Sequence, residues 1–424
     1  MSGLVVIGAS YAGVQACLTA RDSGYAERIT IVADEHSLPY QRPPLSKGFL
    51  LGLESKESLI LRDGAFFEKK AIDLVLGTRA LEIDKRSRKV LLGGGSELAF
   101  DKVVIATGSH ARQLPIQGAD LDGVCYLRSL HDAVDLKARL HDASEIVVIG
   151  GGFIGLEVAA SATKLGKKVT VLESASRLLE RAVSPLVSEF LLDTHVQHGA
   201  DVLLEETAAS IEGRHGRVAA VLCGNNRRIP ADLVLIGVGG LPNDQLAKSV
   251  GLKCTNGIVV DDHGRTSDSN IFAAGDCTSH FNIFAQEWLR LESVQNAQDQ
   301  AKAAGLAIAG DTGPYESVPR FWSDQYDAKL QIVGISRNFD TQAVRGSIED
   351  GKFSVFYYRQ KKLIAVDSVN RAGDQMAARR LIAGGISPSP EEVMDLSFDF
   401  KSLLKAADSA SVAAQKSEPL ERPV

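Results

Sequence analysis

The first three quarters of the chain alternate between short apolar runs and longer stretches of helix-forming composition. The apolar runs are rich in β-branched residues and lie at 4–7, 29–32, 103–106, 146–149 and 271–274. Buried strands separated by helices are typical of βαβ units. The pattern therefore predicts an α/β fold, with a further helix over 295–309.

After residue 314 the pattern changes to short segments of alternating polarity, separated by turns that contain Gly, Asp and Asn. The expected strands lie at 330–335, 341–345, 353–358 and 363–369, and the expected helices at 375–383 and 390–404. Short strands followed by helices predict a small α+β domain. From residue 406 the chain has no apolar periodicity, so we expect a disordered tail over 406–424.

One βαβ stretch, residues 146–173, carries glycines in the spacing G-x-G-x-x-G, at Gly150, Gly152 and Gly155. These glycines allow a tight turn, a close approach of the backbone to a pyrophosphate, and close packing of helix on strand. Glu173 ends the second strand, where an acid accepts the ribose hydroxyls of NAD and repels the extra phosphate of NADP. The stretch therefore predicts an NAD(H) site, with the phosphates at the start of the helix.

The chain opens with a second copy of this pattern, in which Gly8, Ser10 and Gly13 occupy the three positions. Serine is small enough to admit the phosphates, so this copy indicates a second nucleotide site. Because the middle glycine is missing, an ordinary strand-to-helix turn stays open as the alternative.

Length and composition restrict the possible functions. A chain of 424 residues suggests two or three domains, and 45% hydrophobic with 24% charged residues indicates a soluble globular protein. The net charge of -6 gives no reason to expect nucleic acid or an anionic membrane as a partner. We find no N-terminal signal and no uncharged apolar run near about 18 residues, which favours the cytoplasm. The five cysteines never occur as C-x-x-C, so a disulfide framework, a zinc site and a redox-active dithiol lose support.

Two dinucleotide patterns in one chain are expected where a flavin and a nicotinamide must meet. Two further apolar strands support this, one ending in Ala106-Thr107-Gly108 and the other in Gly275-Asp276. With the N-terminal pattern, these segments resemble the FAD-binding domain of the two-dinucleotide flavoprotein reductases. The resemblance implies that Asp276 binds the flavin ribityl chain, and that Asp34 or Glu35 binds the adenosine ribose.

The resemblance also implies a division into domains. The FAD-binding domain would be discontinuous, over 1–110 and 243–315, with the NAD-binding domain inserted at 111–242. A C-terminal α+β interface domain would follow over 316–405. The expected fold is therefore two Rossmann-like dinucleotide-binding domains plus an α+β domain, the glutathione reductase-like fold.

The segment LPYQRPPLSK at 38–47 narrows the family. Disulfide reductases of this superfamily carry reactive cysteine facing the flavin, and this segment contains none. It resembles instead the ferredoxin reductases that serve bacterial oxygenases, as do YLR at 126–128, RLESVQNA at 290–297 and FWSDQY at 321–326. The resemblance extends from about residue 4 to about residue 405. It departs from the family pattern at Ser10, and at Gln41, where an acid is common.

Lys47 ends that segment and follows Pro43 and Pro44, each of which fixes its own φ and so makes the turn rigid. A buried ammonium is costly without a carboxylate, and Glu157, two residues past Gly155, is the expected partner. The resemblance implies that this pair lies where the flavin N5 accepts hydride. The alternative is a surface lysine and a solvated glutamate, which the residues alone would favour for an isolated lysine.

The resemblance extends the candidate site beyond the glycines. Further cofactor-binding candidates are Tyr11, Ala12, Phe153 and Ile154 at the two turns, and Arg42, Pro43, Arg128, Glu292, Ser293, Val294, Trp322, Gly237, Val238 and Gly239 elsewhere. The helix that begins near Val294 would point its amides at the flavin pyrimidine edge, where negative charge develops on reduction. The alternative is a helix that packs in the protein without contacting the cofactor. Trp322 would lie near the flavin on the exit route for electrons, or be a core tryptophan. Residues 237–239 would border the nicotinamide, or serve only to leave the sheet.

These inferences predict an NADH-dependent ferredoxin reductase, an oxidoreductase of the EC 1.18.1 class. Hydride would pass from NADH to FAD, and single electrons from there to a two-iron two-sulfur ferredoxin of a monooxygenase or Rieske-type oxygenase system. Lys47, Glu157 and Trp322 are the candidate catalytic residues, no metal site is expected, and the protein would be a monomer or a weak homodimer. The alternatives are an NADH-dependent flavin oxidase or small-molecule reductase, and a redox-sensing flavoprotein of the apoptosis-inducing-factor type.

Ferredoxins of this type are generally acidic, so we expect their docking face on the reductase to be locally basic. Residues 316–405 contain 13 Lys and Arg against 12 Asp and Glu, whereas the whole chain is at -6. Candidates for a basic patch are Arg290, Arg337, Lys361, Lys362 and Arg371, which the sequence does not place together. A solvated face of mixed charge would have the same balance.

Overall fold

The computed structural model describes residues 2–311 and 313–405, and the chain forms two compact units. The first unit comprises Met1–Arg181 and Pro185–Ser317, and the second comprises Ala182–Ser184 and the chain from Val318 onward. The expected tail over 406–424 lies outside the described residues.

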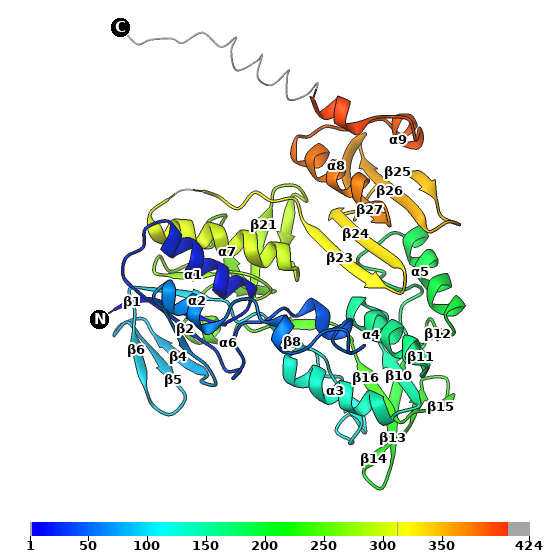
Figure 1. The fold of residues 1–424 in the computed structure, drawn as a ribbon, viewed down its shortest axis with the longest axis horizontal. Helices are drawn as coiled ribbons and strands as arrows, with labels where there is room; N and C mark the ends of the chain where they lie inside the picture. The colour runs from blue at the N-terminus through cyan, green and yellow to red at the C-terminus, as the bar shows by residue number, and fades with distance from the viewer. Residues whose placement is uncertain (1, 312, 406–424) are drawn as a thin grey trace. The chain divides into compact units, whose positions relative to one another are not determined.

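The first unit is built on two five-stranded parallel sheets (Figure 1). In spatial order, the first sheet contains β20 (Ile271–Ala273), β7 (Lys102–Ile105), β1 (Gly3–Ile7), β2 (Arg28–Val32) and β3 (Ile72–Val75). The second contains β12 (Asp201–Leu203), β11 (Lys168–Leu172), β10 (Glu145–Ile149), β16 (Leu233–Ile236) and β9 (Val124–Cys125). The central strands β1, β7, β10 and β16 are buried almost throughout, as continuous apolar runs between helices require. The expected α/β fold with two Rossmann-like sheets is confirmed.

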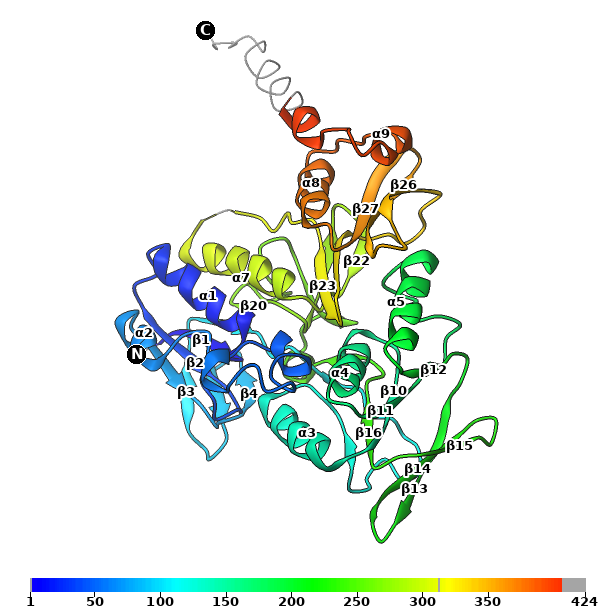
Figure 2. The same ribbon diagram turned by 45° about the vertical axis from the view of Figure 1, so that its right-hand side comes forward.

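Helices follow the strands as the βαβ pattern predicts. Helix α1 (Tyr11–Asp22) joins β1 to β2, and α4 (Phe153–Lys164) joins β10 to β11. Helix α7 (Val294–Ala309) lies beside α1 in both ribbon views (Figures 1 and 2). The other helices of this unit are α2 (Gly64–Lys69), α3 (Leu130–Asp142), α5 (Pro185–Gln197) and α6 (Gln245–Ser249), with the short 3-10 turns η1 (Pro43–Ser46) and η2 (Glu57–Leu59).

The chain passes between the two sheets twice, and the two crossings pair with each other. They form the antiparallel strands β8 (Ser109–Ala111) and β17 (Gly240–Pro242). The domain boundaries that we expected, at 110/111 and 242/243, fall within or directly beside this ribbon. Which dinucleotide binds on each side of this β8–β17 ribbon stays a prediction.

Smaller antiparallel elements complete the first unit. One sheet contains β4 (Ala80–Asp84), β5 (Lys89–Leu92) and β6 (Glu97–Ala99), and another β13 (Ala208–Arg214), β14 (Arg217–Cys223) and β15 (Arg228–Pro230). A third contains β18 (Cys254–Thr255), β19 (Gly257–Val260), β21 (Thr278–Asn282) and β22 (Glu287–Leu289), in which β19 and β21 are parallel.

The second unit is a five-stranded antiparallel sheet with helices. Its strands lie in the order β23 (Arg320–Gln325), β24 (Ala328–Gly334), β27 (Lys362–Val369), β26 (Lys352–Arg359) and β25 (Thr341–Ser347). Helix α8 (Ala372–Ala383) packs on β24 and β27. The expected α+β class and its four strands are confirmed, and β23 is an additional edge strand.

The single helix that we expected over 390–404 is wrong. Helix α9 (Pro390–Met394) stops after five residues, and a further helical segment begins at residue 400. The reason is Arg345, a buried side chain on β25. Its guanidinium donates to the carbonyls of Val393, Asp395, Leu396 and Phe398. A side chain therefore satisfies carbonyls that a continuous helix would use itself.

Among the described residues, no helix combines the length and the apolar character that crossing a membrane requires.

Candidate functional site

The turn between β1 and α1 has a backbone that only glycine permits. Gly8 adopts φ +116°, and a Cβ there would lie 2.2 Å from the carbonyl oxygen of Ala106. A Cβ on Gly13 would lie 1.9 Å from the carbonyl oxygen of Gly8. The first glycine makes the tight turn, and the third lets the helix pack on the strand.

The turn between β10 and α4 repeats this geometry. Gly150 adopts φ +110°, and a Cβ there would lie 2.5 Å from the carbonyl oxygen of Gly237. A Cβ on Gly155 would lie 2.2 Å from the carbonyl oxygen of Gly150. The structure thus brings Gly237, a predicted site residue, against the glycine turn at the carboxyl end of the sheet.

Ser10 fits the position where the fingerprint has its middle glycine. At the equivalent Gly152, a Cβ would meet only the Gly237 carbonyl oxygen, at 3.9 Å, so this position has room for a small side chain. Ser10 has φ -118°, which any residue adopts. The departure from the pattern therefore distorts nothing in the turn.

The first turns of α1 and α4 have no side-chain cap. The Ser10 side chain accepts no hydrogen bond from the amides of α1, and Gly152 has no side chain that could cap α4. In contrast, Ser129 caps α3 and Ser293 caps α7. The amides of 11–13 and 153–155 are thus left for a ligand, and a helix N-terminus with free amides favours phosphate.

The acidic residues after β2 have different surroundings. Glu35 accepts hydrogen bonds from the Tyr40 hydroxyl at 2.6 Å and from an Arg42 NH2 group at 2.7 Å, so both of its oxygens are occupied. Asp34 is exposed, and its carboxylate pairs with no residue that the structure describes. Of the two candidates for binding the adenosine ribose, Asp34 is the more accessible to a ligand, because it is exposed whereas Glu35 is ion-paired with Arg42.

Glu173 follows β11 and is fixed beside the second glycine turn. Its Oε2 accepts from the Gly151 amide and its Oε1 from the Ala175 amide, each at 2.7 Å. These bonds orient the carboxylate at the end of the strand. This is the place from which it can accept ribose hydroxyls.

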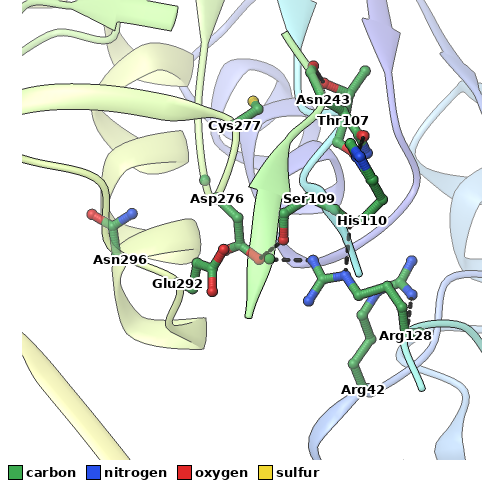
Figure 3. A network of polar contacts seen from close by, with 12 residues as sticks. Arg42, Thr107, Ser109, His110, Arg128, Asn243, Asp276, Cys277, Glu292 and Asn296 are labelled. Atoms are coloured by element: carbon green, nitrogen blue, oxygen red, sulfur yellow. Dashed lines mark hydrogen bonds and ion pairs between the residues drawn. The ribbon is translucent and has the colours of Figure 1, made fainter. Parts of the chain in front are cut away.

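Asp276 lies in a network that joins both parts of the first unit (Figure 3). Its Oδ2 pairs with an Arg128 NH2 group at 2.7 Å, and Arg128 also donates through Nε to the Ser109 carbonyl at 2.9 Å. Arg42 in turn donates to the Arg128 carbonyl at 2.7 Å. The structure therefore brings together three predicted site residues that are far apart in the sequence: Arg42, Arg128 and Asp276.

Asn243 was not predicted, although it holds the crossing next to the Ala106-Thr107-Gly108 segment. Thr107 donates through Oγ1 to the Asn243 carbonyl at 2.6 Å, and Asn243 Nδ2 donates to the Thr107 carbonyl at 2.8 Å. The Asn243 amide also donates to the Gly108 carbonyl, and its Oδ1 lies 2.6 Å from His110 Nδ1. A single asparagine after a strand carries no signal of such a role in the sequence.

Lys47 and Glu157 form the expected ion pair, with Nζ 2.7 Å from Oε2. The Glu157 side chain is 6% exposed and that of Lys47 19%. The pair connects the turn after η1 with the second turn of α4. The alternative of a surface lysine and a solvated glutamate is wrong.

The segment before α7 is polar and ordered. Ser293 accepts from the Asn296 amide at 3.1 Å, and Arg290 pairs with Glu292. The helix begins at Val294, as predicted, so Glu292 and the capping residue Ser293 lie directly before its first turn. Glu292 lies near residue 240, because a Cβ on Gly240 would come within 2.8 Å of its Oε1.

Trp322 lies on the edge strand β23 of the second unit, and its side chain is 40% exposed. It is therefore not a core tryptophan. Its place on an exit route for electrons stays a prediction.

The cysteines have no role in this site. All five are free, and Cys17, Cys125, Cys223 and Cys277 are buried. Burial raises the pKa of the Cys277 thiol to about 11, which disfavours a reactive thiolate. Mostly buried, unpaired thiols give no support to a redox-active dithiol.

Comparison with known proteins identifies the family. Residues 2–301 match the pyridine nucleotide-disulphide oxidoreductase family, and residues 320–404 match the Reductase C-terminal family. The chain is 42% identical to rhodocoxin reductase of Rhodococcus erythropolis, over 94% of this chain and 93% of the relative. It is 38% identical to putidaredoxin reductase of Pseudomonas putida, over 95% and 97%.

Two solved structures extend the likeness to three dimensions. The ferredoxin reductase for the CYP199A2 system from Rhodopseudomonas palustris has a TM-score of 0.93 and 41% identity, over 95% of this chain and all of that one. The covalent putidaredoxin reductase-putidaredoxin complex contains a chain with a TM-score of 0.92 and 38% identity, over 96% and 99%.

The residues present fit both expected cofactors. Two glycine turns without Cβ atoms, two helix N-termini without side-chain caps and the exposed Asp34 suit two dinucleotides. The family uses FAD and NAD(H), so this prediction is confirmed, as is that of an oxidoreductase. The chain therefore belongs to the pyridine nucleotide-disulphide oxidoreductase family and shares its Reductase C-terminal domain with the ferredoxin reductases.

Proposed function

We propose that this protein oxidises NADH and delivers single electrons to a two-iron two-sulfur ferredoxin that serves an oxygenase. FAD, when bound, supplies the conversion between a hydride and single electrons. The relatives include ferredoxin reductases and rubredoxin-NAD(+) reductases, and one related structure is a complex with putidaredoxin. The observation that carries the proposal is the Lys47–Glu157 pair, which joins the segment 38–47, a segment without cysteine, to the helix of the second glycine turn.

The chain's own groups divide the work of binding. We assign the amides of 11–13 to the pyrophosphate of FAD, Asp34 to its adenosine ribose, and Asp276 to its ribityl chain. The amides of 153–155 and Glu173 are assigned to NADH. The two uncapped helices support this division, as do the contacts that already orient Glu173 and Asp276.

The Lys47–Glu157 pair is assigned to the end of the site where hydride arrives. A nearly buried carboxylate holds the ammonium in one direction, so that the positive charge is present before the reaction begins. The pair is assigned no proton transfer. Its role is orientation and electrostatic stabilisation.

The acceptor separates this function from its alternatives. We expect NADH-reduced protein to transfer electrons to a two-iron two-sulfur ferredoxin from the same organism faster than to oxygen, as measured by stopped-flow absorbance of the flavin. If every such ferredoxin accepts electrons more slowly than oxygen does, the reductase assignment is wrong and an oxidase or redox sensor takes its place. The cytoplasmic location, and the monomer or weak homodimer, stay predictions.

A further inference from the structure

Ser46 makes two contacts with α4 beside the ion pair. Its hydroxyl donates to Glu157 Oε2, the same oxygen that accepts from Lys47. Its carbonyl accepts from the Ser161 hydroxyl at 2.9 Å. Glu157 and Ser161 are four residues apart and therefore lie on one face of the helix. The dipeptide Ser46-Lys47 thus binds two successive turns of α4.

These contacts are largely shielded from water. Ser46 is 5% exposed, Ser161 3% and Glu157 5%. In such surroundings, a polar group that loses its partner keeps its desolvation penalty. The hydrogen bonds of the two serines therefore fix the position of η1 relative to α4. Apolar side chains could fill the same space, but they would not fix this position.

This connection determines the rotation of the carboxylate. Lys47 alone could follow Glu157 through several rotamers, because a lysine has a flexible four-carbon stem and a point charge. With Ser46 also bound, Oε2 has two donors and a single orientation. The hydrogen bond from Ser161 fixes where the Ser46 backbone lies along the axis of α4.

Helix α4 also carries the amides assigned to the NADH pyrophosphate. Its first turn begins at Phe153, and the connection at Glu157 and Ser161 lies one and two turns further along. A shift of α4 against the turn at Ser46 would therefore move the bound nicotinamide relative to Lys47.

We infer that Ser46 and Ser161 are positioning residues for hydride transfer, which hold α4 in register with the turn that carries Lys47. The inference rests on the proposed function. Because a misplacement of about 1 Å can cost about 100-fold in rate, we expect Ser46→Ala and Ser161→Ala to lower the limiting rate of flavin reduction by roughly 10-fold to 100-fold. The apparent Kd for NADH should change by less than about 3-fold, because the groups assigned to the pyrophosphate and ribose are untouched.

Thr163→Val is the matched control. Thr163 lies on the same helix, but its hydroxyl donates only to the Ala159 carbonyl of α4 itself, at 2.8 Å. This variant removes a half-buried hydroxyl from the same helix and keeps the side-chain shape. It should retain the rate of the unmodified protein.

Two measurements test the inference. Hydrogen-deuterium exchange of the holoenzyme, read by mass spectrometry, should become faster in peptides covering 43–53 in Ser161→Ala and stay unchanged in Thr163→Val. Stopped-flow reduction by NADH over a range of concentrations gives the limiting rate and the apparent Kd separately. Unchanged exchange at 43–53, or a limiting rate in both alanine variants equal to that of Thr163→Val, would overturn the inference alone. If NADH does not reduce the flavin of the unmodified protein, the proposed function is refuted and the inference falls with it.

Discussion

Removing one partner of the Lys47–Glu157 pair should have unequal effects. Lys47→Met removes the charged partner from a carboxylate that is 6% exposed and accepts from the Ser46 hydroxyl, and breaking a buried ion pair in this way costs about 3–5 kcal/mol. Glu157→Gln leaves an ammonium that is 19% exposed and can reach water, so its cost should be about 1–2 kcal/mol, that of a lost charged hydrogen bond. The double variant should be less destabilised than the sum, with a coupling of about 2 kcal/mol.

Urea unfolding of the four proteins, followed by circular dichroism, measures these differences in the free energy of unfolding. The exposed pair Lys168–Glu145 is the control: its atoms are 2.8 Å apart, but its side chains are 72% and 34% exposed. Lys168→Met should cost less than about 1 kcal/mol. The reasoning is refuted if Lys47→Met costs no more than Lys168→Met, or if the effects at Lys47 and Glu157 are strictly additive.

Three further predictions concern specificity, docking and pH. Glu173→Ala should reduce the ratio of kcat/KM for NADH to kcat/KM for NADPH. If the unmodified protein already uses both donors with similar kcat/KM, Glu173 does not select between them. Lys361 and Lys362 are exposed, whereas Arg290 and Arg371 from the expected patch are paired with Glu292 and Asp374. Replacing both lysines with Glu should therefore slow ferredoxin reduction by about 10-fold at low ionic strength and leave ferricyanide reduction unchanged; an effect that persists in about 0.5 M salt would contradict electrostatic steering. Burial raises the pKa of Asp367 from 3.8 to about 7, so the folded protein keeps a proton that the unfolded chain loses. The free energy of unfolding should therefore fall by about 1.4 kcal/mol per pH unit as the pH rises between about 4 and 7, and then level off. Urea midpoints at pH 5 and pH 7.5 measure this fall, and Asp367→Asn should not show it.

Local patterns determined most of the fold and the outline of the site. The glycines at 150 and 155 allow a close approach of backbone that side chains would exclude, and the β-branched apolar run at 146–149, bounded by glycine, favours a buried strand. Steric and solvation effects of this kind act within a few residues, so they are present in the sequence. The resemblance to the family, and not local physics alone, indicated that Lys47 is buried; a buried ammonium needs a carboxylate, which named Glu157 as its partner.

Tertiary contacts decided which polar groups are already in use. The sequence offered Asp34 and Glu35 equally, and only the approach of Tyr40 and Arg42 from the following loop occupies Glu35. The sequence also did not indicate that Ser46 would meet Glu157, 111 residues away.

The helix expected over 390–404 was lost for the same reason. Helix propensity is a weak local preference, and Arg345, about 50 residues earlier in the chain, offers the backbone carbonyls of that segment a better donor. Apolar periodicity records that a residue is buried, whereas the partner of a buried polar group is chosen by whatever the folded chain brings within hydrogen-bond distance. The sequence by itself therefore determined the strands, the glycine turns and the family of this protein, and only the tertiary structure decided which acids are available to a ligand and which serines hold the ion pair in place.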